Sequence, residues 1–315
     1  MDTLSICIPT NRSKKNLEKC LYSIKKAVKP NNLKFNICIS DNSMDFSKKN
    51  LIKKYNKDFR IIYKFQKKKT NRVTNMIDSI NLSQNDFIWL IGDDEIILKK
   101  SLKNIEKIFS TKKKDIDFIF LNSSFIKKNK NFLSNKKISN FYELIDPKIS
   151  YDFMGAMFLG VFRRSKWQKN KYLLKSFKLG NKEFSNFENT FPHLIIFTRA
   201  FLFSKIIVSS KVYTSNFIKK REWSYLWPLV QSIRIPEVLK NYRKHGLPFY
   251  RYYICRNYSI RFFIPNIIKI LINKKLYPIS YTNLLKHLIT NLIYPNLYFS
   301  PITFLFNKLK NSTYD

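Results

Sequence analysis

Glycine and acidic residues are both scarce in this chain of 315 residues, and each shortage excludes something. With only 5 glycines, the chain has no glycine-rich phosphate-binding loop, and its tight turns have to be built from Asn or Asp. Asp and Glu together number 21 against 59 Lys and Arg, which gives a formal net charge of +38. A surface this basic favours polyanionic partners such as phosphorylated substrates, anionic lipids or nucleic acid.

Cysteine is also rare, and its positions carry no metal or disulfide pattern. Cys7, Cys20, Cys38 and Cys255 form no CxxC pair and have no spacing typical of a metal site. Cys7 and Cys38 lie in apolar runs and are predicted to be buried thiols. Nothing in the sequence requires disulfides, and the chain opens on a strand-like run rather than a signal peptide. We therefore expect a reducing, cytoplasmic location.

Apolar runs typical of strands alternate with helical periodicity through the first 120 residues or so. Strands are expected at residues 4–8, 35–39, 60–63, 87–91 and 116–121, and helices near residues 17–28, 51–55, 73–80 and 102–109. This alternation predicts an α/β fold with a mostly parallel sheet covered by helices. Ligands of such sheets bind beyond the carboxyl ends of the strands.

Three consecutive acids, Asp93, Asp94 and Glu95, follow the fourth expected strand. This density of charge at a strand end is costly unless a cation neutralises it. A divalent metal carrying a diphosphate would do so, because Mg²⁺ and Mn²⁺ take carboxylate and phosphate oxygens together. The alternative is a solvated acidic turn that caps a helix beginning near Lys99. Polar residues also follow the first two strands, and the solvated-turn reading does not explain why Asp41 follows the second.

Taken together, these motifs resemble the family 2 glycosyltransferases, which are inverting nucleotide-sugar enzymes with the GT-A fold. Residues 5–12 look like the family's first strand and its Pro-Thr-Tyr-Asn-Arg turn, here without the Tyr. Residues 39–43 are similar to the second motif, and residues 89–95 resemble the metal-binding DxD motif, with the LxGDD core of the abequosyltransferase-like subgroup. The chain departs from the pattern at residues 43–46, where the family usually has Ser-Thr-Asp-Gly, and at Glu95, where an Asp is usual.

The resemblance implies roles for the residues at the strand ends. Asp94 and Glu95 would bind a divalent metal, Mn or Mg, and Asp93 would face the ribose of the nucleotide. Asp41 would hold the base or the ribose. The other residues that the resemblance places at the nucleotide-sugar donor are Pro9, Thr10, Asn11 and Arg12.

Two further polar residues lie on the helix expected after the third strand. Arg72 and Asn75 are within reach of the donor if that helix begins beside the site. The alternative is an ordinary exposed helix face, to which both side chains would belong equally well.

The residue that acts as catalytic base is left open by the sequence. Inverting transfer needs a positioned base that takes the proton of the acceptor hydroxyl. Glu188 is one of few acids in a Lys-rich segment, and Asp152 precedes a strand-like run at residues 156–162 that would floor the acceptor site. His193 belongs to a Pro-His feature that resembles the subgroup, although a single His before an apolar helix is more often structural.

The C-terminal third has a different composition. From Lys219 onward the only acids are Glu222, Glu237 and Asp315, and aromatic residues cluster with Arg and Lys. Basic, aromatic helices of this kind lie in the interface of anionic membranes, although packing against the catalytic domain as ordinary core is the alternative. Residues 288–306 carry no charge, but Asn and Pro interrupt them, which favours a shallow or re-entrant segment over a true span.

The sequence therefore predicts a GT-A domain at residues 1–220 and a helical membrane-association region at 221–315. Within the first, residues 1–122 would hold the donor and residues 123–220 the acceptor. The expected function is inverting transfer of a sugar from a nucleoside diphosphate to a lipid-linked or surface-polysaccharide acceptor, such as lipopolysaccharide or capsule, at the inner face of the cell membrane. A nucleotidyltransferase of similar fold is the alternative enzyme, but it would be expected to carry a glycine-rich phosphate loop, which this chain lacks. A nucleic-acid-binding protein would not explain the acids, so no nucleic-acid partner is expected.

Overall fold

The chain forms two compact units in the computed structural model, which describes residues 2–11, 13–28, 32–111, 116–123, 138–147, 156–176, 183–216 and 223–312. The first, called the sheet unit, comprises Met1–Glu143, Ala156–Tyr172 and Phe203–Lys219. The second, called the helical unit, comprises Leu144–Gly155, Leu173–Leu202 and Lys220–Asp315. Arg12 and Asp152, two of the candidate site residues, lie outside the described residues.

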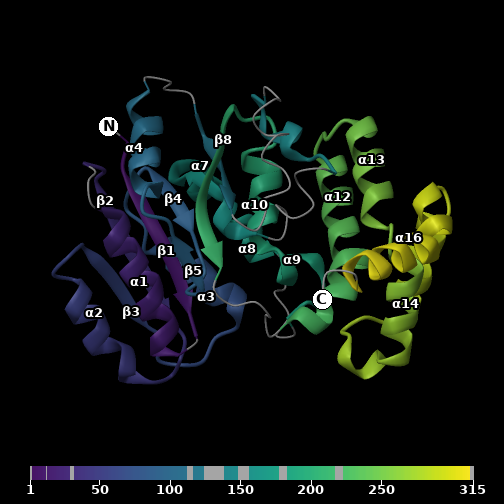
Figure 1. Cartoon of the computed structure of the whole chain (residues 1–315), viewed down its shortest axis with the longest axis horizontal. Coiled ribbons are helices and arrows are strands. Elements are labelled where there is room, and N and C mark those ends of the chain that lie inside the picture. The colour runs from purple at the N-terminus through teal and green to yellow at the C-terminus, as the bar shows by residue number, and fades with distance from the viewer. Residues whose placement is uncertain are drawn as a thin grey trace. The chain divides into compact units, whose positions relative to one another are not determined.

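The sheet unit begins with the alternation of strands and helices that the sequence predicts (Figure 1). Its elements up to residue 123 are β1 (Leu4–Thr10), α1 (Lys14–Val28), β2 (Phe35–Asp41), η1 (Phe46–Lys48), α2 (Lys49–Tyr55), β3 (Ile61–Phe65), α3 (Arg72–Asn81), β4 (Phe87–Leu90), β5 (Glu95–Ile97), α4 (Ser101–Ser110) and β6 (Phe118–Ser123). The later described elements are η3 (Phe141–Leu144), η4 (Met157–Leu159), β7 (Gly160–Arg163), α7 (Arg164–Asn170) and β8 (Ile206–Asn216). The α/β prediction for this half of the chain is confirmed.

The described strands form one eight-stranded sheet in the order β3-β2-β1-β4-β7-β6-β8-β5. β1 pairs in parallel with both β2 and β4, and β2 pairs in parallel with β3. β7 and β5 run antiparallel to their neighbours, so the sheet is mostly parallel, as predicted. Because β1 lies between β2 and β4, the carboxyl ends of these three strands meet at one edge.

The core of the sheet unit follows from the apolar patterns of its strands and helices. The residues of β4 are all buried, as expected for a parallel strand covered on both faces. On α1, the buried residues Leu17, Leu21 and Ile24 recur at helical spacing, and α1 packs against β5 and α4. α3 packs against β1 and β2, which places its first turn beside their carboxyl ends. All four cysteines are free and buried, which confirms the prediction for Cys7 and Cys38.

Two strand boundaries differ from the expectation, and one strand was not expected. β1 does not end at residue 8 but continues to Thr10, with Pro9 opposite Ser40 of β2. Glu95 opens the unpredicted strand β5, and α4 begins at Ser101. Only the last part of the strand-like run at residues 156–162 is a strand, because a 3₁₀ turn, η4, precedes β7.

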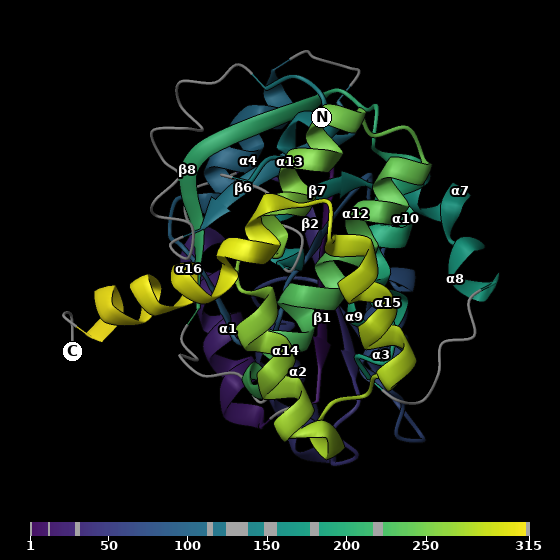
Figure 2. The same cartoon turned by 90° about the vertical axis from the view of Figure 1, so that its right-hand side faces the viewer.

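The helical unit consists mainly of helices that pack on one another (Figure 2). Its elements are α8 (Leu173–Ser176), α9 (Phe187–Thr190), α10 (Pro192–Ala200), η5 (Ser224–Leu226), α11 (Trp227–Leu229), the π-helix η6 (Val230–Arg234), α12 (Ile235–Lys244), α13 (Phe249–Ser259), α14 (Phe263–Ile272), η7 (Lys274–Leu276), α15 (Tyr281–Asn291) and α16 (Pro295–Ser312). α12 packs on α13 and α10, and α16 packs on α13 and α14. The prediction of a mainly helical C-terminal region is confirmed.

Non-local contacts draw α8, α9 and α10 into the helical unit, although the sequence analysis grouped residues 1–220 together. Arg234, at the end of η6, is 3% exposed and donates hydrogen bonds to the backbone oxygens of Phe184 (3.0 Å) and Ser185 (2.7 Å). Its guanidinium also binds both carboxylate oxygens of Glu237 at 2.8 Å. This paired, hydrogen-bonded cation ties the segment before α9 to α12. None of the described helices is long and apolar enough to cross a membrane.

Candidate active site

The carboxyl ends of β1 and β4 are joined by a hydrogen bond between two of the predicted site residues. The hydroxyl of Thr10, the last residue of β1, donates to Oδ2 of Asp93 at 2.6 Å. The side-chain amide of Asn75, on α3, donates to the backbone oxygen of Thr10 at 3.1 Å. Both residues are buried, so these contacts hold the end of β1 in place. Thr10, Asn75 and Asp93 therefore lie together, as expected from the strand order.

The three acids lie in and beside a tight turn between β4 and β5. Asp93, Asp94 and Glu95 are 3%, 5% and 1% exposed, which is far from the solvated turn that the sequence left open. The turn is closed by a hydrogen bond from the backbone N–H of Glu95 to the oxygen of Gly92 at 3.2 Å. A Cβ at Gly92 would meet Oδ1 of Asp94, so any other residue here would push the Asp94 side chain aside. The local sequence thus folds a carboxylate back over its own turn.

Cys20 of α1 lies beside this turn, and the charges of the three acids affect its thiol. Its Sγ lies 3.9 Å from the backbone oxygen of Gly92. Burial raises the pKa of the Cys20 thiol well above its ordinary value, and the charges of Asp93, Glu95 and Asp94 raise it further. All three carboxylates are therefore close enough to act electrostatically on one buried sulfur.

The three acids have the donor chemistry of a magnesium or manganese site. Carboxylates are the protein ligands these ions prefer, and such ions take much of their coordination from substrate phosphates and water. Among the described residues, no group of three or more His, Cys, Asp or Glu side chains is arranged as a ready metal cage. The turn thus has the carboxylate chemistry that suits a metal arriving with a phosphate-bearing substrate, beside the Asp93–Thr10 contact.

Asp41, at the end of β2, is fully buried and is held by three donors from the chain itself. Its Oδ1 accepts hydrogen bonds from the backbone N–H of Ser43 (3.0 Å) and from Nζ of Lys48 (3.2 Å). Its Oδ2 accepts one from the hydroxyl of Tyr63 on β3 (2.8 Å). Asp41 and Lys48 are both 0% exposed. Burial, with the contact and charge of Asp41, raises the pKa of Tyr63. Asp41 therefore organises the turn after β2.

The loops after β2 and β3 are interlocked beside this ion pair. The side-chain amide of Asn42 donates to the backbone oxygen of Thr70 (2.6 Å), and its Oδ1 accepts from the Thr70 N–H (2.8 Å). Asn71 then caps α3 by accepting a hydrogen bond from the N–H of Thr74 (2.8 Å). Arg72, the first residue of α3, is partly exposed directly after this cap. Pro9 is also partly exposed, and Asn11, just beyond β1, is exposed.

Glu188 and His193 belong to the helical unit and have contrasting surroundings. Glu188, in the first turn of α9, lines a cavity of about 610 Å³ together with Glu237, Lys240 and Arg243. Burial raises the pKa of the Glu188 carboxyl, and the charge of Glu237 adds to this effect. His193 is 2% exposed, and its ring lies edge-to-face with that of Phe197 at 5.4 Å between centroids. Such packing is typical of a structural residue.

Sequence reasoning missed Lys48, Tyr63 and Cys20, which surround the predicted acids. Lys48 is one of several lysines between residues 48 and 54, and nothing in the local pattern marks it as buried. Tyr63 lies on β3, and aromatic residues are common in strands. Lys48 and Tyr63 contact Asp41, and Cys20 contacts the backbone oxygen of Gly92, only in the folded chain.

A mostly parallel sheet whose strand ends gather buried acids and a hydroxyl is an arrangement typical of nucleotide-binding α/β enzymes. The sequence pattern of the family described as "Glycosyl transferase family 2" matches residues 5–191, which is more than half of the chain. The protein belongs to this family and is a glycosyltransferase.

Individual relatives agree with this assignment. Abequosyltransferase RfbV of Salmonella typhimurium is 36% identical over 101 residues, which cover 31% of this chain and 30% of that protein. The mannosyltransferase PcManGT from Pyrobaculum calidifontis, solved with GDP-Man and Mn²⁺, superposes with a TM-score of 0.59 at 10% identity, over 96% of this chain and 84% of that one. Residues 1–349 of S. aureus TarS give 0.55 at 14% identity, over 82% and 71%. The GT-A fold is thereby confirmed.

Proposed function

We propose that this glycosyltransferase uses a nucleoside-diphosphate sugar with a divalent metal, Mn or Mg, and transfers the sugar with inversion to a lipid-linked or surface-polysaccharide acceptor. The observation that carries the donor part is the buried run Asp93–Glu95 at the end of β4, joined to β1 through Thr10. Carboxylates at this edge and a leaving diphosphate are both groups that a divalent cation binds, and the cation would neutralise the charge that builds on the diphosphate.

The roles of the chain's own residues follow from their positions. Asp94 and Glu95 would hold the metal, which when bound neutralises the charge that builds on the leaving diphosphate. Asp93, fixed by the hydroxyl of Thr10, would orient the ribose side of the donor. Asp41 would shape the part of the site that receives the nucleotide, through the turn that it holds.

Similar folds support this choice of donor. PcManGT is solved with GDP-Man and Mn²⁺, and S. aureus TarS is solved with UDP and with UDP-GlcNAc. These ligands belong to those proteins. They favour a nucleoside-diphosphate sugar here because this chain shares their fold.

A thermal-shift screen of nucleoside diphosphates with and without Mn²⁺ tests the donor proposal. We expect one nucleotide to raise Tm when Mn²⁺ is present and much less when it is absent, because a ligand that binds only the folded state stabilises it. At a hundredfold excess over Kd the stabilisation is about 2.7 kcal/mol. If no nucleoside diphosphate changes Tm under either condition, the donor assignment is wrong.

We propose Glu188 as the base on the acceptor side. It is partly buried, lines a cavity, and has a raised pKa. A carboxylate accepts a proton only when it is ionised. A raised pKa therefore moves the acid limb of the rate profile to higher pH than an ordinary Glu would give.

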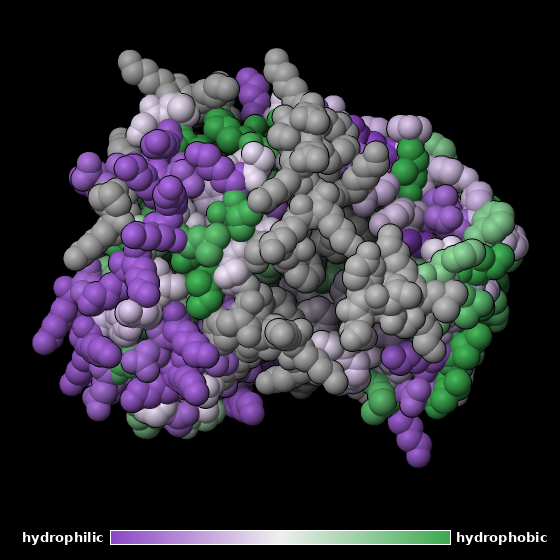
Figure 3. Space-filling model, viewed as in Figure 1, coloured by the Kyte–Doolittle hydropathy of each residue, from purple (hydrophilic) through white to green (hydrophobic). Residues whose placement is uncertain are grey.

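The acceptor is proposed to be presented at a membrane, because α14, η7, α15 and α16 expose many apolar side chains. Each of them is at least 39% exposed, and no acid occurs between residues 238 and 314. Hydrophobic residues gather along the right-hand margin of Figure 3, over α14 and α16. This apolar face consists of Ile268, Leu271, Ile272, Leu276, Tyr281, Leu285, Ile289, Leu292, Ile293, Tyr298, Phe299, Ile302, Phe304, Leu305 and Phe306.

An exposed apolar surface of this extent usually marks an interaction site. Lys269, Lys274, Lys275 and Lys286 lie on the same elements, so the face combines apolar and basic groups. This is the chemistry of a protein surface that rests on anionic lipid, with apolar side chains inserted and lysines at the headgroups. We therefore infer peripheral docking on the cytoplasmic face of the cell membrane.

Phe306→Asp is expected to weaken binding to anionic vesicles by about tenfold, because it replaces an inserted ring with a repelled charge. Phe203→Asp, in the sheet unit, is the matched control and should bind like the unchanged protein, since the two rings are 69% and 64% exposed. Co-sedimentation with vesicles across a salt series is the measurement. Binding should decrease with salt but persist, because screening beyond about 8 Å removes only the electrostatic part. Full-length protein that stays in the supernatant at low salt would exclude the membrane proposal.

A further inference from the structure

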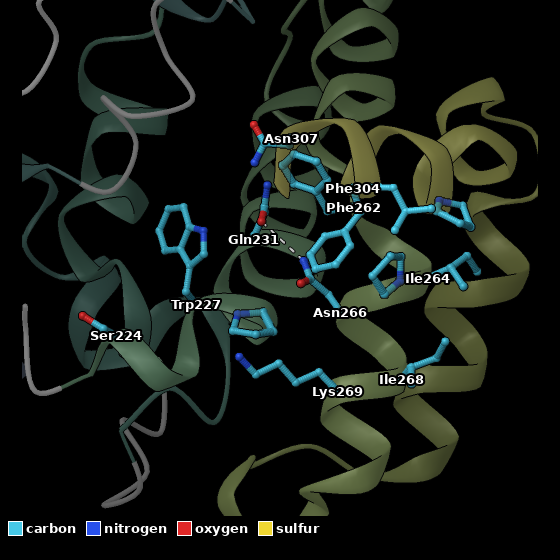
Figure 4. A pocket seen from close by; sticks show the side chains of 14 residues that line it. Ser224, Trp227, Gln231, Phe262, Ile264, Asn266, Ile268, Lys269, Phe304 and Asn307 are labelled. Carbon is cyan, nitrogen blue, oxygen red and sulfur yellow. Dashed lines mark hydrogen bonds between the residues drawn. The ribbon is translucent and has the colours of Figure 1, made fainter. Parts of the chain in front are cut away.

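A cavity of about 690 Å³ opens among α11, α14 and α16 of the helical unit (Figure 4). Apolar side chains make up most of its lining, namely Trp227, Pro228, Phe262, Ile264, Pro265, Ile268, Pro301, Phe304 and Leu305. Its size and composition are those of a site for a small organic ligand, which is usually concave and apolar with few polar groups. Neither the donor site nor the proposed base uses this cavity.

The cavity is built around a proline inside α16. Pro301 has no N–H to donate to the oxygen of Leu297, one turn earlier, and the hydroxyl of Ser300 donates to that oxygen at 2.8 Å instead. The same hydroxyl accepts the N–H of Ile264, at the start of α14, at 3.2 Å. Ser300 is 0% exposed, so one buried hydroxyl satisfies the proline site and fixes α16 to α14. An edge-to-face contact of Phe262 and Phe304 at 6.2 Å adds to this wall.

The polar residues deep in the cavity are engaged with each other. The side-chain amide of Asn266 donates to Oε1 of Gln231 at 3.3 Å and to Oγ of Ser232 at 2.9 Å. Gln231 and Ser232 belong to the π-helix η6, and such single-turn distortions occur frequently at functional sites. Apart from these groups the lining is mainly apolar, and it includes the exposed cation of Lys269.

The charged residues around the cavity indicate which chemical group the ligand carries at its mouth. No acid lines the cavity, and none occurs in α13, α14, α15 or α16. Lys269 therefore favours an anionic group beside an apolar tail. Leu305 belongs both to the cavity lining and to the exposed apolar face, so a chain can pass from a membrane into the cavity along α16.

We propose that this cavity binds the hydrocarbon chain of a lipid phosphate, with Lys269 beside the phosphate. The inference deepens the proposed function and rests on it in part, since a lipid-linked acceptor is one source of such a ligand. A phospholipid of the membrane is the other source, and it has the same chemistry of a long apolar chain next to a phosphate.

Direct binding of soluble lipid phosphates to the full chain tests this proposal. The probes are farnesyl phosphate, farnesol and dihexanoyl phosphatidylglycerol, each kept below the concentration at which it forms micelles. Intrinsic fluorescence reports binding in a Trp223→Phe background, because Trp227 lines the cavity, the neighbouring ring of Trp223 at 6.3 Å between centroids is removed, and Trp89 and Trp167 are 0% exposed in the sheet unit. Adding Trp227→Phe should remove most of the signal. We expect saturable binding of at least one of the two phosphate-bearing probes, and weaker binding of farnesol than of farnesyl phosphate.

Two matched pairs of variants locate the binding. Leu305→Ala should weaken it about tenfold through lost apolar contact, whereas Ile302→Ala should not. Leu305 and Ile302 are 59% and 54% exposed on the same helix, but only Leu305 lines the cavity. Lys269→Ala should weaken binding of the lipid phosphate about fivefold and leave farnesol unaffected, with Lys275→Ala as its control.

The outcomes separate the two sources and can overturn the inference. Binding of farnesyl phosphate alone assigns the cavity to a lipid-linked acceptor, and binding of the phosphatidylglycerol alone assigns it to a membrane lipid. Either result supports the lipid site. No saturable binding, or equal losses in Leu305→Ala and Ile302→Ala, would refute it. The assay contains no sugar donor, so a failed nucleotide screen leaves its result intact.

Discussion

Asp94→Asn and Glu95→Gln are each expected to lower the rate of sugar transfer by about a hundredfold or more, a loss of at least about 2.7 kcal/mol of transition-state stabilisation. Both acids are almost completely buried at the turn after β4, and an amide keeps their shape while removing the charge that a metal requires. The same variants should lose the Mn²⁺-dependent part of any rise in Tm with nucleoside diphosphate. Transfer rates measured across a Mn²⁺ series, together with thermal shifts, give both readouts.

Two further variants make this result specific. Glu18→Gln changes an exposed acid that pairs with Lys54 on the surface of the sheet unit. This variant should behave like the unchanged protein in both assays. Glu188→Gln should keep the metal-dependent nucleotide shift but lose transfer, because a base acts on the acceptor and not on the donor. If Asp94→Asn or Glu95→Gln retains full activity in the presence of a chelator, the metal role of that residue is wrong.

The donor half could be predicted from sequence because its signals are local. Each strand from β1 to β4 is a short apolar run bounded by turn residues, and each helix between them shows its own periodicity. The acids stood out because three charges directly follow an apolar run. Their gathering with Thr10 and Asn75 follows from the observed strand order, in which β1 lies between β2 and β4, and Thr10 contacts both Asp93 and Asn75.

The remaining features depend on partners that are distant in sequence. β5 has only three residues, begins with a carboxylate, and exists because β8 pairs with it more than a hundred residues later. The grouping of α8, α9 and α10 with the helical unit rests on contacts that are distant in sequence, among them those of buried Arg234 to residues 184 and 185, which no local pattern indicates. From sequence Lys48 looks like a surface lysine, but in the fold it pairs with Asp41 of β2, which Tyr63 of β3 also contacts.

Asp41→Ala is expected to lower the free energy of unfolding by about 3–5 kcal/mol, because it leaves the cation of Lys48 buried without its carboxylate. Asp41 and Lys48 are both 0% exposed, so water cannot replace the lost partner. Urea denaturation of the single variant and of Asp41→Ala with Lys48→Met is the measurement. The double variant should recover most of the loss, since an apolar side chain of similar length carries no charge to desolvate.

The contrast with an exposed ion pair shows whether burial is the cause. Lys54 and Glu18 form an exposed pair, with the two side chains 66% and 43% exposed. Replacing Lys54 should change the free energy of unfolding by less than about 1 kcal/mol. Equal effects in the two pairs would contradict the argument from burial.

The stabilised double variant also decides how Asp41 serves the nucleotide. Asp41 already accepts hydrogen bonds from Ser43, Lys48 and Tyr63, so its effect on a ligand can pass through the turn that it orders. If the double variant folds stably and binds nucleoside diphosphate as the unchanged protein does, Asp41 acts only by holding that turn. If stability returns while nucleotide affinity, measured by calorimetry without acceptor, stays low, the carboxylate itself contacts the base or ribose, as its place in the second sequence motif predicts.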